Sequence, residues 1–240
     1  MKGVSNFPIQ LPHEVEDQIP KIVDHYNSIH SGRKLNFHPL LSHGSLLYKS
    51  KLGKWTVFSK FQLFSGKYEL EVTAMQLAVL SSWNRRPNDA LLLQDLLVST
   101  MLPEVELRKT LFSLTQNPKL KLQIILTEPE IKGKRDFTSD VKFRINRGFA
   151  LIKGGKVAPR GKVSLIGRLP LVAERPNADD QQEIEHLRGI RVQEAISKIL
   201  KSRKTITLTN LVPELVELLR SQFLPSKKLI KVKIDKFQPF

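Results

Sequence analysis

The residue best placed to do chemistry is Lys201, because it lies opposite the apolar side of a predicted helix. The run 188–206 reads RGIRVQEAISKILKSRKTI, and each residue of a helix advances by about 100°. The apolar residues of this run share an arc of about 140°; they are Val192, Ala195, Ile196, Ile199 and Leu200. Lys201 lies about 180° from Val192 and should therefore be exposed. An exposed amine is a nucleophile that can accept an acyl group from an enzyme thioester and form an isopeptide bond.

Basic neighbours predict a positively charged surface around this lysine. They are Arg191, Lys198, Arg203 and Lys204. Residues 188–240 hold twelve basic and four acidic side chains, in a chain of 240 residues with net charge +16. Such an excess attracts acidic protein surfaces and equally nucleic acid, and its plainer interpretation is solubility and compensation of the helix dipole.

Other kinds of site have little support. The chain has no cysteine, which excludes a thioester-forming catalytic cysteine and a cysteine-bound zinc RING. Histidines at 25, 30, 38 and 43 lack the spacing and acidic partners of a metal site. Residues 154–156, GGK, lack the flanking residues of a phosphate-binding loop and predict a turn. We therefore expect a non-catalytic protein with no cofactor and no metal.

The first third of the chain predicts a small α/β element. Apolar residues at helical spacing indicate a helix over 14–26. Strand-like runs follow at 34–37, 45–48 and 68–72. No stretch reaches the roughly 20 apolar residues of a membrane span, and the N-terminus lacks the apolar core of a signal peptide. These features predict an intracellular protein of the cytoplasm, the nucleus or both, without a membrane partner.

The centre of the chain predicts three short helices and a strand, which is a winged-helix pattern. Thr73 and Gln76 form a capping box that begins the first helix. The second helix covers 91–99, the third runs from Pro103 to 115, and a strand follows over 120–127. The fold class that we expect is α+β, in which a small α/β sheet element is combined with winged-helix units.

The last part of the chain should complete that sheet and repeat the winged-helix opening. Strands are expected at 141–145 and 162–171, on either side of a turn at 153–156, and the second strand should return to the first sheet. Residues 177–185 predict a polar connector. After the Lys201 helix, a helix over 210–222 should bury Leu215, Leu218 and Leu219. Ser226 can cap a third helix that holds Leu229 and Ile230.

A basic winged-helix DNA-binding protein is the main alternative. In such proteins the third helix enters the major groove, and here that helix carries Lys227, Lys228, Lys231 and Lys233. These lysines could neutralise phosphates. However, residues 227–236 contain no Arg, Asn or Gln for bidentate base contacts, and residues 188–222 contain no aromatic side chain on which single-stranded bases could stack. A solvated or protein-docking face is the favoured interpretation.

Several blocks of the sequence resemble the C-terminal region of the cullin family, in particular its cullin-five branch. The blocks are HSGRKL at 30–35, YELEVTAMQLAVLSSWN at 68–84, ELRKTLFSL at 106–114, GKVSLIGRLPLVAER at 161–175, RVQEAISKILKSRK at 191–204 and ELVELLRSQFLPSKKLIK at 214–231. In cullins, the lysine of the segment that ILKSRK resembles accepts a ubiquitin-like modifier. The resemblance therefore implies that Lys201 is the site of this modification, called neddylation.

The resemblance also implies a scaffold role in a cullin-RING ubiquitin ligase, in ubiquitin-dependent protein degradation. A RING-box protein would add a strand to the sheet and supply the RING, and the modifier would arrive with its conjugating enzymes. Its attachment would loosen the last winged-helix unit and the RING. Adaptor and substrate binding belongs to N-terminal repeats that we expect to be absent from this chain.

The resemblance also suggests a division into domains. The end of a helical bundle and the start of the α/β element occupy 1–72, with an insertion expected at 51–65. A first winged-helix unit occupies 73–130, returning strands 131–175, an acidic linker 176–187 and the neddylation winged-helix domain 188–240. The ending KVKIDKFQPF departs from the family, so this last domain is expected to be incomplete.

Overall fold

The computed structural model describes residues 7–51, 65–131, 137–167, 178–203 and 205–235. Its elements are α1 (His13–Glu16), α2 (Ile19–Ile29), β1 (His43–Lys51), β2 (Ser65–Thr73), α3 (Ala74–Ser81), α4 (Leu93–Thr100), α5 (Glu104–Thr115), β3 (Ile125–Glu128), β4 (Lys142–Ile145), β5 (Leu151–Lys153), β6 (Lys156–Ala158), β7 (Arg160–Ser164), α6 (Ala178–Arg203), α7 (Leu208–Leu219) and α8 (Lys227–Ile234). The expected α+β class is confirmed.

The main sheet has the strand order β1-β2-β7, with an antiparallel β1–β2 pair and a parallel β2–β7 pair. The strands predicted at 45–48 and 68–72 are confirmed. The return of the strand expected at 162–171 to this sheet is also confirmed, although β7 ends at Ser164, residues 165–167 are irregular, and 168–171 lie outside the described residues. The strand predicted at 34–37 is wrong: that segment is irregular and mostly exposed, without a neighbouring strand to pair with. The predicted insertion at 51–65 lies outside the described residues except at its ends, where Lys51 and Ser65 pair across the hairpin.

Helices α3 and α5 pack with the sheet around a core that includes Leu70, Val79 and Leu111. The predicted capping box begins α3. The Gln76 backbone amide donates to Thr73 Oγ1 at 3.2 Å, and the Thr73 backbone amide donates to Gln76 Oε1 at 3.0 Å. The Gln76 side chain also donates to the Leu165 carbonyl at 3.2 Å. One side chain thus ties the helix start to the segment that follows β7.

After α5 the chain forms the antiparallel pair β3–β4, so the order of three helices and then a strand is as predicted. The strand begins five residues later than the expected start at 120, because Gln123 holds the preceding segment as a loop. Its Oε1 accepts from the Asn117 amide at 2.7 Å, and its Nε2 donates to the Leu120 carbonyl at 3.0 Å. The predicted turn at 153–156 joins β5 to β6, and Gly154 and Gly155 have φ of 55° and 78°.

The polar connector expected at 177–185 is wrong from Ala178 onward, because α6 begins there and continues for 26 residues. Glu183 and Glu185 are exposed, while Ile184 is buried against the core of the first part of the fold. Helical propagation from the strongly amphipathic run that follows explains this extension. The division into domains stays a prediction.

Helices α6, α7 and α8 enclose a second apolar cluster, built on Val192, Ile196, Leu215 and Ile230. We call residues 188–235 the C-terminal unit, and β1 to β7 with α3, α4 and α5 the body. The expected burial of Leu218 is wrong, since it is 39% exposed while Leu211 is 4% exposed. The buried leucines of α7 repeat every four residues, at 211, 215 and 219, and position 218 falls outside that stripe.

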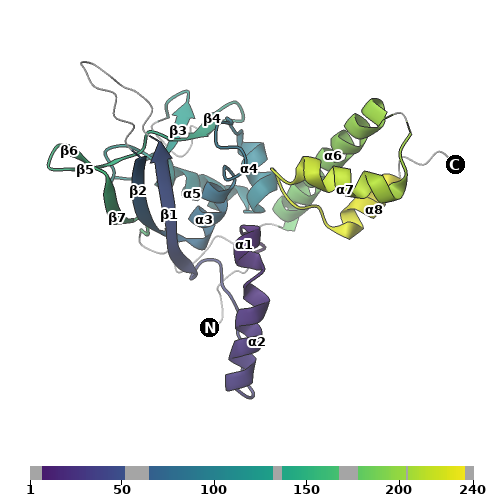
Figure 1. Ribbon diagram of the computed structural model, residues 1–240, viewed down its shortest axis with the longest axis horizontal. Coiled ribbons are helices and arrows are strands. Elements are labelled where there is room, and N and C mark those ends of the chain that lie inside the picture. Colours follow the sequence, from purple (N-terminus) through teal and green to yellow (C-terminus); the bar gives the residue numbers. More distant parts are fainter. Residues whose placement is uncertain (1–6, 52–64, 132–136, 168–177, 204, 236–240) are drawn as a thin grey trace.

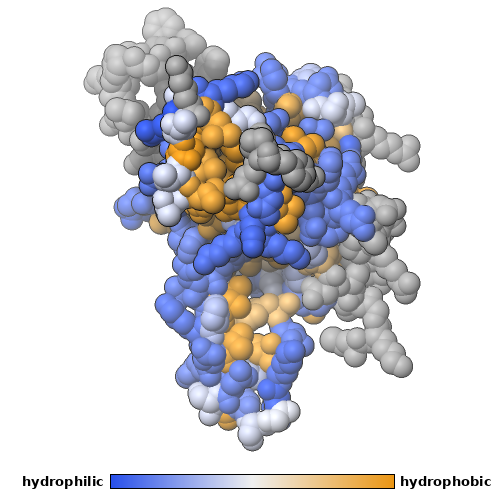
Figure 2. Space-filling view, turned by 90° about the vertical axis from the view of Figure 1, so that its right-hand side faces the viewer, coloured by the Kyte–Doolittle hydropathy of each residue, from blue (hydrophilic) through white to orange (hydrophobic). Residues whose placement is uncertain are grey.

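Figure 1 shows the body at one end of the molecule, the C-terminal unit at the other, and α4 facing α6 between them. Helices α1 and α2 extend away as an arm, and a break at residues 17–18 divides the single helix expected at 14–26. Seen from the α6–α8 end, this arm shows apolar surface (Figure 2), and Ile22 and Ile29 are among its exposed apolar residues. Among the described residues, no helix combines the length and apolar character that a membrane crossing requires.

Candidate modification site on helix α6

The second half of α6 presents two opposite faces, as the sequence predicts. Val192, Ala195, Ile196 and Ile199 are buried against α7 and α8, and Leu200 is half-buried at the edge of this stripe. Burial of such a stripe removes apolar surface from water at about 25 cal/mol per Å², which fixes the rotation of the helix about its axis. The opposite face must therefore point to solvent.

Lys201 lies on that solvent face and is exposed. Within the described part of the chain it takes part in no hydrogen bond and no ion pair. It lines a shallow surface depression together with Ile190, Glu194, Ser197 and Lys198. A helical backbone carries the lysine, so its Cα position is fixed while its amine is free to reach outward. That combination suits an acceptor of a group carried by another protein.

The four basic neighbours of Lys201 differ in how much free charge they offer. Arg191 donates to Asp95 of α4 at 3.0 Å and to Glu194 at 3.3 Å. Arg203 pairs with Glu214 of α7 at 3.4 Å. Lys198, one helical turn before Lys201, is exposed and unpaired among the described residues. Lys204 lies outside the described residues. The expected basic surface is therefore weaker than the sequence suggests.

The DNA-binding alternative depends on the lysines of α8, and three of these side chains are accessible to a phosphate backbone. Lys227, Lys228 and Lys231 are exposed. Lys233 instead lies half-buried against Gly189 of α6: a Cβ added at that glycine would meet the Lys233 Cε at 2.7 Å. The same helix exposes Val232, which is 47% accessible, so its outer face is mixed in character. The alternative stays a prediction.

The structure shows no metal site among the described residues. No group of three His, Asp or Glu side chains there is arranged to hold an ion. His30 packs on the Tyr26 ring, with 4.5 Å between centroids, and His43 contacts the Leu41 carbonyl at 3.3 Å. These contacts agree with the structural role that the sequence favours for the histidines.

Sequence reasoning missed Arg188, a buried residue through which the C-terminal unit contacts the body. Its Nε donates to the Val98 carbonyl near the end of α4 at 2.9 Å, and its guanidinium lies over the Phe223 ring at 4.7 Å from the centroid. The residue is only 8% exposed, and burial lowers the pKa of Arg188 to about 10. The helical wheel contains the missing signal, because Arg188 lies about 40° from Val192, on the buried stripe.

Comparison with known proteins adds the family context to this geometry. Residues 2–149 match the Cullin alpha+beta domain, which is more than half of the chain. Cullin-5 of Caenorhabditis elegans is 41% identical over 235 residues, covering 97% of this chain and 29% of the relative. Cullin-3 of the same organism is 27% identical, covering 95% of the chain and 30% of the relative. Cullin-3A of Arabidopsis thaliana is 28% identical, with 95% and 28% covered. The chain thus spans about a third or less of these relatives.

Proposed function

The chain belongs to the cullin family, and from this premise we propose that it is a non-catalytic scaffold segment of a cullin-RING ubiquitin ligase whose Lys201 accepts a ubiquitin-like modifier. In this role the chain binds a RING-box protein and serves ubiquitin-dependent protein degradation. Adaptor and substrate binding falls to other parts of the ligase.

The observation that carries this proposal is the placement of Lys201. Its amine is exposed on the face of α6 opposite the buried stripe, and no described side chain competes for it. Isopeptide formation requires the amine to attack a thioester in an enzyme's cleft, which expels the thiol of that enzyme. The cysteine-free chain cannot supply this thiol, so the chemistry comes from conjugating enzymes and the RING from the RING-box protein.

Reconstituted modification tests the acceptor residue. The full chain with its RING-box partner, the modifier and the conjugating enzymes should gain one modifier. Lys201→Arg should abolish the product, because a guanidinium keeps the charge and the helix but is not an acceptor. Lys198→Arg is the matched control: it lies one turn away on the same exposed surface and should leave the yield unchanged. Equal labelling of wild type and Lys201→Arg would refute the assignment.

The free edges of the main sheet support the proposed docking of the RING-box protein by strand addition. In the described sheet these edges are β1 and β7. The Ala74 amide donates to the Ser42 carbonyl at 2.9 Å. The alternation of an antiparallel ladder then turns the amides of Ser45, Leu47 and Lys49 outward from β1. Leu47 is 60% exposed, so a change there spares the core.

Proline substitutions separate edge pairing from side-chain contact. Leu47→Pro removes one outward amide of β1, and Lys162→Pro does the same on β7, without breaking the inner ladders. Leu47→Ala and Lys162→Ala keep the amides and serve as controls. Strand addition predicts that one proline variant loses the RING-box protein while its alanine control retains it. Binding that survives both proline variants would contradict strand addition and leave the Lys201 assignment untouched.

A further inference from the structure

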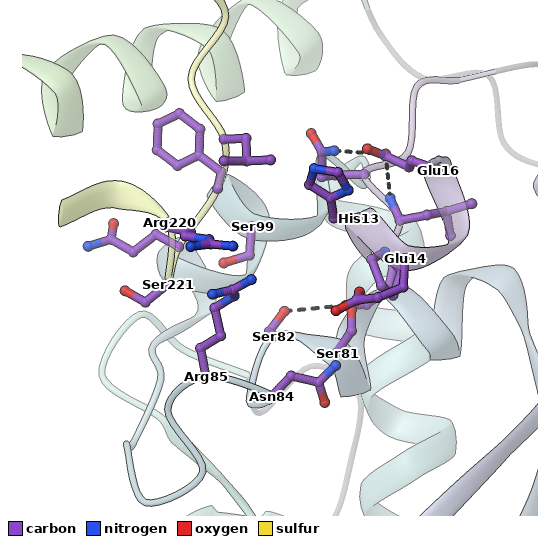
Figure 3. Close-up of a pocket in the computed structure, with 17 residues that line it drawn as sticks. His13, Glu14, Glu16, Ser81, Ser82, Asn84, Arg85, Ser99, Arg220 and Ser221 are labelled. Atoms are coloured by element: carbon purple, nitrogen blue, oxygen red, sulfur yellow. Dashed lines mark hydrogen bonds between the residues drawn. The ribbon is translucent and has the colours of Figure 1, made fainter. Parts of the chain in front are cut away.

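A crevice lies where three parts of the chain meet: the segment 10–16 before and within α1, the end of α3 with Ser99 of α4, and the loop 220–224 between α7 and α8. It is far from the exposed face of α6 that carries Lys201, and no lining residue is shared with the depression there. Figure 3 shows Arg85 of the body and Arg220 of the C-terminal unit extending toward the same space beside Ser99.

The two arginines at this crevice are poorly neutralised. Arg85 is exposed and makes no hydrogen bond or ion pair within the described part of the chain. Arg220 has only an exposed contact of 3.4 Å with Glu217, whose side chain is 74% accessible. Such surface pairs contribute little. Two like charges from different parts of the fold therefore face one space without a carboxylate between them.

Two further arginines lie directly behind the lining. Arg86 donates from Nη2 to Ser99 Oγ and from Nε to the Ser82 carbonyl, both at 3.0 Å, and both serines line the crevice. Arg188 lies against Phe223, another lining residue, and its Nη2 is buried without a hydrogen-bond partner. These two arginines feel nearby carboxylates, those of Asp89 and Asp95 at Arg86 and those of Glu16 and Glu185 at Arg188, so the unpaired charge in the lining is that of Arg85 and Arg220.

The carboxylates that line the crevice lie on the wall away from Arg85 and Arg220 (Figure 3). Glu16 keeps its charge but is held in place on that wall, because its Oε1 accepts from Gln10 Nε2 at 2.8 Å and from the Leu11 backbone amide at 3.0 Å. Glu14 lies on the far wall, opposite Arg220 (Figure 3). His13 already pairs with Asp17 at 2.6 Å. The Arg85–Arg220 side of the crevice is therefore electropositive.

The size of the crevice restricts its ligand to a compact ion. Its volume is about 110 Å³, room for a few waters, whereas pockets for organic ligands or cofactors occupy about 300–1,000 Å³. Planar guanidinium forks match the oxygens of phosphate, often in bidentate contacts. Ser221 also lines this space, and its hydroxyl can donate to a further oxygen, whereas the Ser99 hydroxyl already donates to the Asp95 carbonyl at 2.7 Å.

We propose that this crevice binds a compact phosphate-class dianion, which bridges Arg85 of the body to Arg220 of the C-terminal unit. The ion relieves the repulsion between the two arginines and links the two parts of the fold at a further point, in addition to the Arg188–Val98 and Arg191–Asp95 contacts. Bound phosphate therefore favours the packing of the C-terminal unit on the body. Two sources share this chemistry: free inorganic phosphate and the phosphate monoester of a modified side chain.

Calorimetric titration of the full chain tests the site, with inorganic phosphate and O-phosphoserine as separate probes and acetate at equal ionic strength as the reference. Binding of inorganic phosphate alone supports a free ion, and binding of both probes supports a monoester. Arg85→Gln and Arg220→Gln should each weaken binding about tenfold or more, since a charge-assisted hydrogen bond is lost. Arg160→Gln, an exposed charge on β7, is the matched control and should bind as wild type.

Bridging makes a second, independent prediction. Phosphate should slow hydrogen exchange of the Gln222 and Phe223 amides, which now bond the Leu219 carbonyl, and this protection should vanish in Arg85→Gln although position 85 belongs to the body. The proposal is overturned if phosphate binds no more tightly than acetate, if both arginine variants bind as wild type, or if the Arg160→Gln control loses as much affinity as they do.

Discussion

Arg188 allows a prediction in which two opposing effects can be weighed against each other. The residue is 8% exposed and forms no ion pair among the described residues, and the charges of Glu16 and Glu185 only partly offset its loss of hydration. Burial lowers the pKa of Arg188 from its ordinary value to about 10, which corresponds to about 3 kcal/mol against the charged form. Against this cost stand a hydrogen bond to the Val98 carbonyl, at the negative end of α4, and the contact with Phe223.

The substitutions Arg188→Met and Arg188→Lys separate these effects. Arg188→Met forfeits about 1.5–3 kcal/mol of charge-assisted hydrogen bonding and about 0.5–2 kcal/mol of cation–π contact. It also removes the desolvated charge, so the net loss should be only about 1 kcal/mol. Arg188→Lys keeps a buried charge but loses the planar fork, and it should cost about 3 kcal/mol. We therefore expect the conservative change to be the more damaging one.

Urea unfolding followed by circular dichroism measures both losses as shifts in the midpoint at constant slope. Arg191 is the matched control on the next part of the same helix: it pairs with Asp95 at 3.0 Å, and its side chain is 33% exposed. There a lysine can keep the ion pair and a methionine cannot, so the order of the two variants should reverse. If Arg188→Lys matches wild type while Arg188→Met loses more than about 3 kcal/mol, the argument from desolvation is wrong.

Three further predictions concern helix geometry and pH. Gly189→Ala should raise the unfolding free energy by about 0.5–1 kcal/mol, because alanine favours the helix and only the flexible end of Lys233 on α8 must move. A lower unfolding midpoint in urea would show that the Lys233 side chain cannot move aside. Ser226→Ala should cost about 1 kcal/mol through loss of the cap to the Leu229 backbone amide. Thr207→Ala should cost less in the same assay, because the Thr207 side chain bonds the exposed Thr209 hydroxyl and makes no capping bond to the helix backbone. The hydrogen bond from Lys162 lowers the pKa of Glu71 below its usual 4.5. The stability that this carboxylate contributes is therefore present above pH 4.5 and is lost as the pH falls through the lowered pKa. In Lys162→Gln, an NMR titration should find the Glu71 pKa returned toward 4.5, and an unchanged pKa would exclude that bond as the cause.

The orientation of α6 could be predicted from sequence because a single physical rule decides it. The stripe from Val192 to Ile199 has a period near 3.6 residues, and the apolar partners on α7 and α8 are close in the chain. Burying that stripe leaves Lys201 outside without any knowledge of the tertiary fold. The capping box at Thr73 was predictable for the same reason, because both of its hydrogen bonds join residues three apart.

Features that depend on distant residues escaped prediction. The acidic start of α6 looks like a linker because its local composition is polar, yet Ile184 finds its partners in the core of the body. The free charge around Lys201 was overestimated because Asp95 and Glu214, which pair with Arg191 and Arg203, lie far away in sequence. Local periodicity contains no information on such partners. Arg188, however, could have been identified from the sequence, because it is a charged residue that the helical wheel places on the buried apolar stripe.

Lys201 and Arg188 lie on different faces of α6, Lys201 near its C-terminal end and Arg188 near its middle. They lie thirteen residues apart, which is about 20 Å along a helix. A modifier attached to Lys201 therefore cannot touch the Arg188–Val98 contact through its isopeptide bond alone. Any effect on the packing of the C-terminal unit must come from movement of α6 as a rigid body, or from contacts that the modifier makes elsewhere. The polar contacts of α6 with α4, Arg188–Val98 and Arg191–Asp95, are the points at which such a force would act.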